Sequence, residues 1–339
     1  MLRDISYNLL KAVGAPAVYH RTCPPLGAVL MCHSIGQPRV REFNPNSKWR
    51  ITPELLERAI TCAQDMGFEA VTMETAADRL RGDGSDHPFF ALTFDDGYAD
   101  NLHAALPVCQ RNRVPMTTYV TSGFVQRKHV AWWHLLEHLI SGHETIRLSV
   151  QGRDTTFECT TLLDKHATFD RIAEWLTLAS KSERAEFLEE VRSRYGSASR
   201  EYADSLFLTE SELQEFNRSD YACVGVHGAS HCAFASLSMD EFYRESDESI
   251  TYLTALTGTT PRHLAYPYGN SAAVTEHSFD LAYKQGFITG VTTRHGCLSR
   301  NENRLMALPR IPLFPADTEN SLQCKLSGLT TLLARWRKQ

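Results

Sequence analysis

The chain of 339 residues is 42% hydrophobic and 22% charged, which is the composition of a globular protein large enough to bury a substantial core. Its formal net charge of −5 provides no basic face for nucleic acid, so no nucleic-acid partner is expected. The nine cysteines are scattered and form no C-x-x-C pair, which argues against a disulfide framework or a zinc ribbon and favours a reducing cytoplasm.

Strand-like and helix-like patterns alternate along the chain. The expected strands are 28–31, 68–72, 89–94, 116–121, 222–226, 263–266 and 287–292, with a last apolar segment at 305–311. The expected helices are 53–66, 74–80, 98–111, 239–256 and 272–285. Such alternation is typical of parallel strands covered by helices. Seven or eight units in a chain of this length predict an α/β fold, a distorted (β/α) barrel with catalytic groups after the carboxyl ends of its strands.

The alternation breaks between about residues 125 and 220, where the chain is charged and mostly helix-patterned. We interpret this segment as a helical insertion in one strand-to-helix loop of a single domain that spans residues 1–339. Insertions at that end of a barrel overhang the active face, so we expect this one to shape substrate choice. The alternative is a peripheral helical subdomain that only adds buried area.

The two ends of the chain bear on its location. The N-terminus lacks the pattern of a secretory signal, and no run of about 18 apolar residues is present, which predicts a cytoplasmic protein without a transmembrane segment. Residues 318–339 carry leucines at helical spacing and end in basic residues, which predicts an amphipathic helix. We favour its packing on the domain, and peripheral contact with an anionic membrane is the alternative.

Two adjacent carboxylates end one expected strand, in the segment Thr93–Gly97 (TFDDG). Such a pair repels itself unless a cation holds it. Another expected strand runs directly into His227 and His231, whose four-residue spacing suits two imidazoles that converge on one ion. Two histidines and one carboxylate leave positions for water and substrate, which is typical of a metal-dependent hydrolase. Asp96 is the natural third ligand, and Asp95 is left to accept a proton from water.

These motifs resemble those of the polysaccharide deacetylase family of carbohydrate esterases, whose first two motifs are T-F-D-D-G and H-S/T-x-x-H. Thr93–Gly97 matches the first in full, and His227–His231 keeps both histidines of the second, with Gly228 in place of the hydroxyl residue. The resemblance implies that Asp95 is the general base. It also implies a divalent ion, most often zinc, with cobalt, nickel and iron as alternatives, held by Asp96, His227 and His231.

The third motif of the family, R-x-P-Y-G, corresponds to Ala265–Gly269, so the arginine that orients the base in many relatives is expected to be absent. A branch that acts on poly-N-acetylglucosamine and related surface glycans is similar here, reading A/W-x-P-Y-G. That branch carries its general-acid histidine early, at a strand end, which corresponds to Cys32–Ile35. The resemblance therefore gives the acid role to His33, since the late segment Leu308–Ile311 contains no histidine.

The same resemblance assigns the oxyanion and substrate-binding positions. It implies that the backbone N–H of Tyr268 faces the oxyanion, and the remaining substrate-binding residues are expected to be Pro267, Asn270, Arg310 and Trp133. Hydrolysis of an acetamide requires a polarised carbonyl, an oxyanion site and an acid that protonates the amine. We therefore expect a deacetylase that removes an acetyl or formyl group from an amino sugar, in an oligomer or a lipid-linked precursor of a surface polysaccharide or glycolipid.

Two alternatives remain open. The segment His134–His138 reads H-x-x-E-H, the pattern of inverted zinc peptidases, in which His134, Glu137 and His138 would serve peptide hydrolysis. With Ala265 in place of the orienting arginine, the protein is alternatively a catalytically degenerate glycan-binding module. The deacetylase is favoured because four residues of its two main motifs are intact, namely Asp95, Asp96, His227 and His231. The sequence indicates no oligomeric state.

Overall fold

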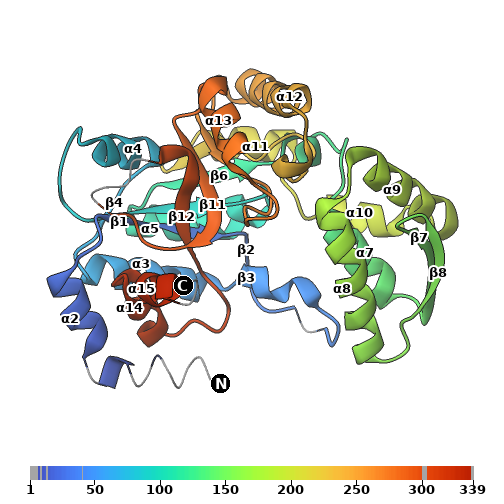
Figure 1. The fold of residues 1–339 in the computed structure, drawn as a ribbon, viewed down its shortest axis with the longest axis horizontal. Coiled ribbons are helices and arrows are strands. Elements are labelled where there is room, and N and C mark those ends of the chain that lie inside the picture. The colour runs from blue at the N-terminus through green and yellow to red at the C-terminus, as the bar shows by residue number, and fades with distance from the viewer. Residues whose placement is uncertain (1–6, 8–9, 13, 40, 300–303, 337–339) are drawn as a thin grey trace.

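The computed structural model describes residues 7, 10–12, 14–39, 41–299 and 304–336. A closed barrel of seven parallel strands is surrounded by helices (Figure 1). In order around the barrel the strands are β1 (Gly27–Cys32), β12 (Leu308–Pro312), β11 (Thr289–His295), β10 (His263–Ala265), β9 (Ala222–Val226), β6 (Met116–Val120) and β5 (Phe89–Phe94). β1 also pairs with β5 and closes the barrel, while β4 (Glu69–Ala70) pairs with β5 as an eighth strand. The predicted (β/α) barrel is therefore confirmed.

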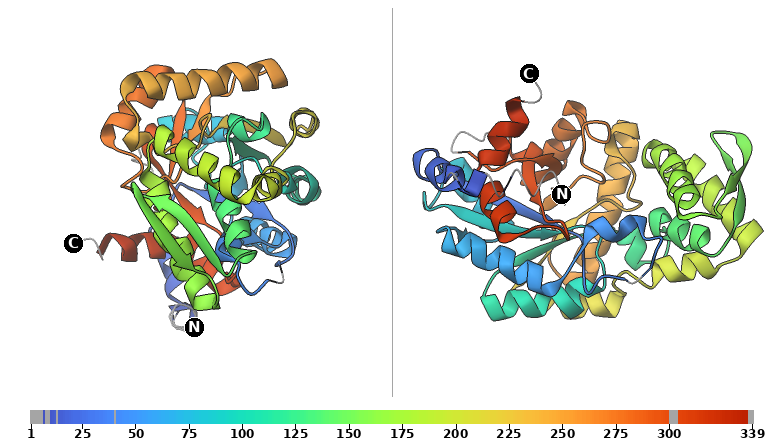
Figure 2. Two further views of the ribbon diagram at one scale, coloured as in Figure 1. Left: turned by 90° about the vertical axis from the view of Figure 1, so that its right-hand side faces the viewer. Right: turned by 90° about the horizontal axis from the view of Figure 1, so that it is seen from below.

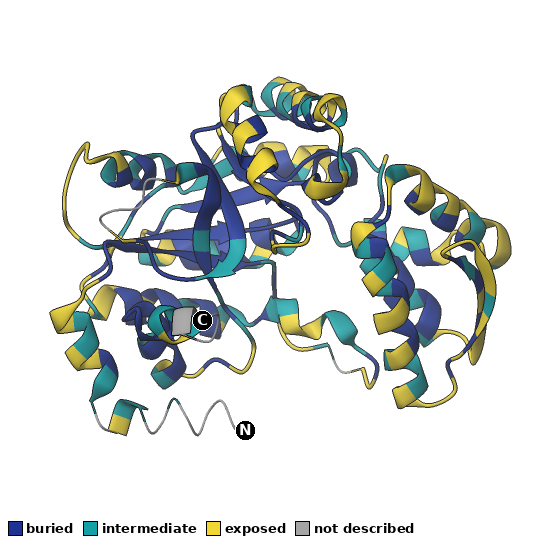
Figure 3. Cartoon of the chain, viewed as in Figure 1, coloured by how far each residue is buried: buried dark blue, intermediate teal, exposed yellow. Residues whose placement is uncertain are grey.

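Successive side chains of the barrel strands point alternately inward and outward. Val29, Ala91 and Leu308 belong to one apolar cluster, whereas Ala28 and Leu92 belong to the cluster that includes the surrounding helices. Both sets are buried (Figure 3), because helices cover the outer face of the strands. This burial on both faces explains why β1 and β5 are buried throughout and mostly apolar, as strands of covered parallel sheets usually are.

Helices lie around the outside of the barrel (Figure 2). They are α2 (Ala15–Thr22), α3 (Pro53–Asp65), α4 (Met73–Arg81), α5 (Leu106–Asn112), α12 (Met239–Thr257), α13 (Glu276–Gln285), α14 (Glu319–Leu326) and α15 (Leu329–Trp336). Hydroxyl side chains determine several of their starts. Thr275, for example, accepts a hydrogen bond from the Ser278 N–H, so α13 begins at Glu276 rather than at the predicted residue 272.

The predicted helix 98–111 is divided in the structure. It starts as a π-helical turn, Asn101–Ala105, and continues as α5. Pro107 lies in the first turn of α5, directly after the π turn, and has no N–H to donate to a carbonyl group of that preceding turn.

The predicted C-terminal helix of residues 318–339 forms two short helices, α14 and α15, on either side of Gly328. Gly328 has a left-handed backbone (φ +85°), a conformation that ends helices and that glycine adopts without strain. Leu322 and Leu326 of α14 are buried, so this part of the apolar stripe packs on the domain. Residues 337–339, with two of the predicted basic side chains, lie outside the described residues. None of the described helices has the length and apolarity needed to cross a membrane.

Most of the segment between β6 and β9 forms a lobe beside the barrel, at the right of Figure 1. The lobe contains α7 (Trp132–Ser141), β7 (Thr145–Val150), β8 (Arg153–Glu158), α8 (Leu162–Leu178), α9 (Lys181–Tyr195) and α10 (Ala198–Asp204). The two end helices of the segment, α6 (Ser122–Val125) and α11 (Glu210–Asn217), contact α12 of the barrel. Much of the lobe surrounds an apolar cluster of its own, which includes Leu136, Ile146 and Ile172.

The antiparallel hairpin β7–β8 was not predicted from the sequence. Its turn residues Gln151 and Gly152 both have left-handed backbones (φ +54° and +73°), which two-residue hairpin loops require. Burial alternates along β7, because only one of its faces packs on the lobe. The alternation in Thr145–Val150 was the available signal, and the surrounding helical pattern obscured it.

Gly290→Ala tests the close packing of the barrel wall. A Cβ atom at this position would lie 2.5 Å from the Tyr266 hydroxyl oxygen and 2.8 Å from the Met306 carbonyl oxygen, so β11 and its neighbours would have to move apart. We expect urea denaturation to show a loss of about 1–3 kcal/mol in the free energy of unfolding, the usual cost of overpacking. Gly142→Ala is the matched control, because its nearest neighbours lie 3.8 Å away or farther. Equal losses in the two variants would contradict this explanation.

Candidate active site

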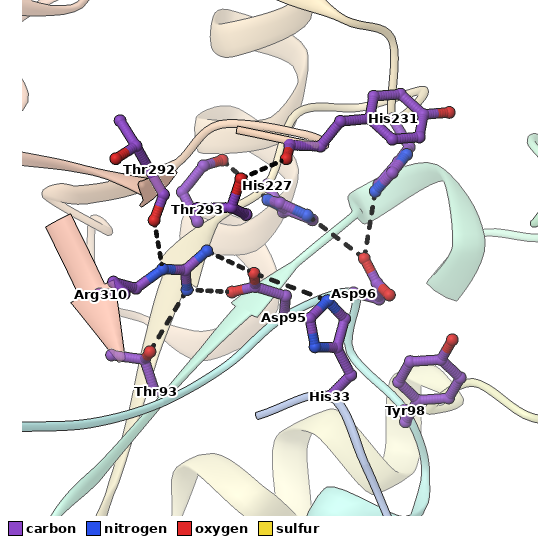
Figure 4. Close-up of polar contacts among 12 residues, drawn as sticks. His33, Thr93, Asp95, Asp96, Tyr98, His227, His231, Thr292, Thr293 and Arg310 are labelled. Atoms are coloured by element: carbon purple, nitrogen blue, oxygen red, sulfur yellow. Dashed lines mark hydrogen bonds and ion pairs between the residues drawn. The ribbon is translucent and has the colours of Figure 1, made fainter. Parts of the chain in front are cut away.

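Three predicted metal ligands meet at the carboxyl ends of the barrel strands (Figure 4). Asp96 follows β5, and His227 and His231 follow β9. The Asp96 Oδ1 atom lies 3.2 Å from His227 Nε2 and 3.1 Å from His231 Nε2, and all three side chains are buried. Within the described part of the chain, no other group of His, Cys, Asp or Glu side chains has the spacing of a metal site.

The chemistry of these three groups fits a cation. The Nδ1 atom of His227 lies 2.7 Å from the Ala265 carbonyl oxygen and donates to it, so Nε2 of the neutral imidazole carries a lone pair. This lone pair faces Asp96 Oδ1, a buried oxygen without a hydrogen-bond donor. The two distances from Asp96 Oδ1 are similar to those between ligands of tetrahedral zinc, which lie about 3.3 Å apart when each bond is about 2.0–2.1 Å.

Three residues at the site have left-handed backbones although none is glycine. Their φ angles are +77° for Asp96, +56° for His231 and +60° for Tyr268. Such conformations cost about 1–3 kcal/mol each and persist only where the surrounding structure holds them. The side-chain directions at this site are therefore maintained by neighbouring contacts.

Asp95 is fixed by a buried arginine. Two nitrogens of Arg310 donate to the two Asp95 carboxylate oxygens at 2.7 and 2.6 Å, and Arg310 Nε donates to the Thr292 carbonyl oxygen at 2.9 Å (Figure 4). Arg310 is 0% exposed. Burial raises the pKa of Asp95, but the Arg310 guanidinium outweighs it and holds that pKa below the ordinary value. The carboxylate is therefore ionised and oriented.

This contact corrects one expectation from the sequence. Ala265 does occupy the usual position of the orienting arginine, but an arginine on a different strand, β12, contacts Asp95 instead. Arg310 was expected to bind substrate. Its side chain lies behind Asp95, and its described hydrogen bonds go to protein atoms, including the Thr93 hydroxyl at 3.3 Å.

His33 lies beside the same carboxylate, with Nε2 3.9 Å from Asp95 Oδ2. Its ring contacts the Trp49 ring at a centroid distance of 4.7 Å. The Asn101 side-chain amide donates to the His33 carbonyl oxygen at 2.9 Å and so fixes the backbone. Burial lowers the pKa of His33, while the carboxylates of Asp96 and Asp95 act in the opposite direction.

A cavity of about 360 Å³ opens onto these groups. Of the expected substrate-binding residues, Tyr268, Asn270 and Trp133 line it, whereas Pro267 is buried and does not. The lining residues that were not predicted include Trp49, Tyr98 and Thr293. Tyr98 directly follows the TFDDG motif, which was an available signal, but nothing in the sequence marks the other two.

The H-x-x-E-H segment forms part of α7 and makes other contacts. His134 Nε2 lies 2.9 Å from the Tyr98 hydroxyl oxygen, and His138 Nδ1 lies 3.0 Å from Ser199 Oγ. The Glu137 carboxylate is buried and accepts a hydrogen bond from the Asn46 amide at 2.5 Å. His134 Nδ1 lies 3.6 Å from Glu137 Oε2, but the three side chains do not form a group with the spacing of a metal site, so the geometry does not support the peptidase alternative.

Comparison with known proteins agrees with this site. A family model described as polysaccharide deacetylase matches residues 83–286, which is more than half of the chain. The chain belongs to the polysaccharide deacetylase family. The predicted family is thereby confirmed. The predicted enzyme class, a carbohydrate deacetylase that hydrolyses amide bonds, is confirmed with it. No curated protein sequence matches the chain significantly.

Solved structures show the same fold. Deacetylase PplD of Streptococcus pyogenes, in complex with acetate, has a TM-score of 0.58 and 18% identity, over 88% of this chain and 97% of that chain. A de-N-acetylase from Aggregatibacter actinomycetemcomitans has a TM-score of 0.56 and 13% identity, over 88% and 98%. IcaB from Ammonifex degensii has a TM-score of 0.55 and 17% identity, over 89% and 97%.

Arg310→Lys tests the orientation of Asp95. Lysine keeps the charge but cannot donate two parallel hydrogen bonds to one carboxylate. We expect kcat for deacetylation to fall by about 10–100-fold, because small displacements of a reacting group have effects of this size, with KM and bound metal unchanged. Arg262→Lys is the control, since Arg262 pairs with Glu74 at the surface. Wild-type kcat in Arg310→Lys would refute the orienting role.

Proposed function

We propose that the protein is a metal-dependent deacetylase that hydrolyses the N-acetyl group of an amino sugar in a surface-polysaccharide or glycolipid precursor. The observation that carries this proposal is the pairing of an oriented carboxylate, Asp95, with an adjacent metal-binding group, Asp96–His227–His231, at one cavity. The neighbouring carboxylates thus have different partners, and we assign them different roles. Zinc is the proposed ion, since two histidines and one carboxylate form a common catalytic zinc site.

The ion would be held by Asp96, His227 and His231, and it supplies Lewis acidity, which lowers the pKa of water and polarises a carbonyl oxygen. Asp95 accepts the proton of the attacking water, because it is ionised and its oxygens are fixed by Arg310. We assign the transfer of a proton to the departing nitrogen to His33.

The proposed oxyanion donor is the N–H of Tyr268. The Thr293 hydroxyl donates to the Tyr268 carbonyl oxygen at 2.8 Å, and the Thr293 N–H donates to the Gly269 carbonyl oxygen at 3.0 Å. These two contacts hold the left-handed turn at Tyr268 in place. A donor fixed before the reaction stabilises a developing negative charge without reorganisation.

The lining of the cavity supports a sugar substrate. Trp49, Tyr98 and Trp133 line it, and flat aromatic faces are suited to the apolar faces of a pyranose ring. Trp133 lies on α7 of the insertion, which supports our proposal that the lobe shapes substrate choice within a single domain. One similar structure is named a de-N-acetylase, and PplD was in complex with acetate. We infer that the acyl group removed from the substrate here is also acetyl.

We further propose that the reaction takes place in the cytoplasm, in solution or at the membrane surface. All nine cysteines of the chain are free thiols, and seven of them are buried. Unpaired thiols in such number are typical of a reducing compartment.

The metal assignment is tested by substitution of each ligand. We expect a loss of zinc affinity of more than about 100-fold in each of Asp96→Ala, His227→Ala and His231→Ala, and activity should fall with it. This loss is larger than the loss of about 10–100-fold that typically follows substitution of a residue that only contacts a metal ligand. Asp95→Asn should keep the ion and lose about 10²–10⁴-fold in kcat, because an amide cannot accept the proton. Metal analysis and mass-spectrometric detection of acetyl loss from N-acetylhexosamine oligomers, nucleotide sugars and lipid-linked sugars measure both effects.

Two outcomes would overturn the assignment. Unchanged metal content in all three ligand variants would remove the metal site. Binding of glycans by the metal-free wild type, with no turnover after zinc is added, would instead favour the degenerate glycan-binding module.

His33→Ala tests the general acid with two substrates. We expect amide hydrolysis to slow by about 10²–10⁴-fold. Hydrolysis of an activated aryl acetate ester should slow much less, because its phenolate leaving group departs without a proton. Bound zinc should not change. Equal slowing of the two substrates would indicate that His33 positions the ion or the carbonyl group instead.

A further inference from the structure

The loop between the two metal-binding histidines is held by a buried carboxylate on α12. Glu245 Oε2 accepts hydrogen bonds from the Ala229 and Ser230 N–H groups, both at 2.9 Å, and Glu245 Oε1 accepts one from the Ser230 hydroxyl at 2.6 Å. The Glu245 side chain is 1% exposed. Burial raises its pKa, but the hydrogen bonds, first that from Lys181, hold the pKa below its ordinary value. An ionised acceptor therefore faces the loop.

Gly228, at the start of this loop, has a backbone conformation that favours glycine. Its backbone is left-handed (φ +73°), and a Cβ atom there would lie 3.4 Å from Glu245 Oε2. The position has no side chain that could bond to the loop. Glu245 supplies from α12 the polar contacts that fix the N–H groups of the next two residues.

The first turn of α9, in the insertion, completes the contact with this loop. Lys181 Nζ lies 2.5 Å from Glu245 Oε1. Arg184, which is buried, donates to the His231 carbonyl oxygen at 2.8 Å. Its other nitrogens donate to the carbonyl oxygens of Leu176 at 3.1 Å and Thr177 at 3.2 Å, at the end of α8.

We propose that Lys181 and Arg184 of the insertion, together with Glu245, are positioning residues of the metal site: they hold the loop in the conformation from which His231 binds the ion. The inference rests on the proposed function, since it concerns the same metal ligands. It gives the insertion a role in the metal centre itself, in addition to a role in substrate choice.

The backbone of His231 explains why such contacts are needed. Its left-handed conformation (φ +56°) is unfavourable for a residue with a side chain. Without the Arg184 hydrogen bond to its carbonyl group, the loop can relax toward an ordinary conformation, and the imidazole then turns away from Asp96. Substitution of outer partners of metal ligands typically weakens metal binding by about 10–100-fold.

The test compares zinc affinities, measured by competition with a chromogenic chelator, in Arg184→Met, Glu245→Gln and a matched control. The control is Arg192→Met, because Arg192 lies on the same helix, is exposed and pairs with Glu189. We expect Arg184→Met and Glu245→Gln to weaken zinc binding by about 10–100-fold and Arg192→Met to leave it unchanged. The visible spectrum of the Co²⁺-loaded protein should change in the first two variants only, a signature that general destabilisation would not produce.

Wild-type zinc affinity and Co²⁺ spectrum in folded Arg184→Met and Glu245→Gln would overturn the inference. If Arg184→Met does not fold, the test uses Lys181→Met and Arg184→Lys, since lysine cannot bridge three carbonyl groups; wild-type affinity in both would overturn it equally. His227→Ala separates the two proposals. If His227→Ala binds zinc as the wild type does, the proposed metal centre is wrong. If it loses zinc while the positioning variants keep wild-type affinity, only the positioning role of Lys181, Arg184 and Glu245 is wrong.

Discussion

The pairing of β1 with β5 is the constraint on which the rest of the structure depends. Six consecutive residue pairs, from Gly27 with Phe89 to Cys32 with Phe94, close the barrel, and the Asp95 N–H donates to the Cys32 carbonyl oxygen at 3.0 Å. The next residue of each strand is therefore His33 on one side and Asp95 on the other. Residues that are distant in sequence become neighbours at the point where the two strands end. The other β1 neighbour, β12, brings Arg310 to the same place.

Two adjacent carboxylates acquire different properties because the closed barrel gives them different partners. Asp95 faces the barrel interior, where the Arg310 guanidinium neutralises it and fixes both oxygens. Asp96 has a left-handed backbone, which turns its side chain toward the imidazoles of His227 and His231, and no lysine or arginine among the described residues pairs with it. A buried carboxylate without a donor is costly unless a cation arrives. The same geometry thus provides one carboxylate that is neutralised by an arginine and one that lies between two histidines.

Residues of the insertion contact the site directly. Its α7 contributes Trp132, whose indole N–H donates to the Tyr268 hydroxyl at 2.9 Å, and Trp133, whose ring lies 4.7 Å from that of His231. Contacts of α9 reach the loop that follows β9. Two left-handed residues of the site, His231 and Tyr268, are therefore in contact with lobe residues. The lobe supplies the packing that keeps the strained backbone of the site in place.

The sequence by itself determined the barrel and the meeting of Asp96, His227 and His231. Parallel strands alternating with helices bring all strand ends to one face, so the residues after β5 and β9 had to meet there whatever the details of packing. The sequence did not determine the partner of Asp95. Arg310 is 215 residues away, and it reaches Asp95 only because β12 lies next to β1 and because the alternation of side chains turns position 310, like position 308, into the interior. Strand order and inward direction are properties of the closed barrel, and no local pattern encodes them. The contacts of Arg184 and Glu245 were decided in the same way, since carbonyl and N–H groups carry no sequence signal and only the packing of α9 and α12 brings side chains to them.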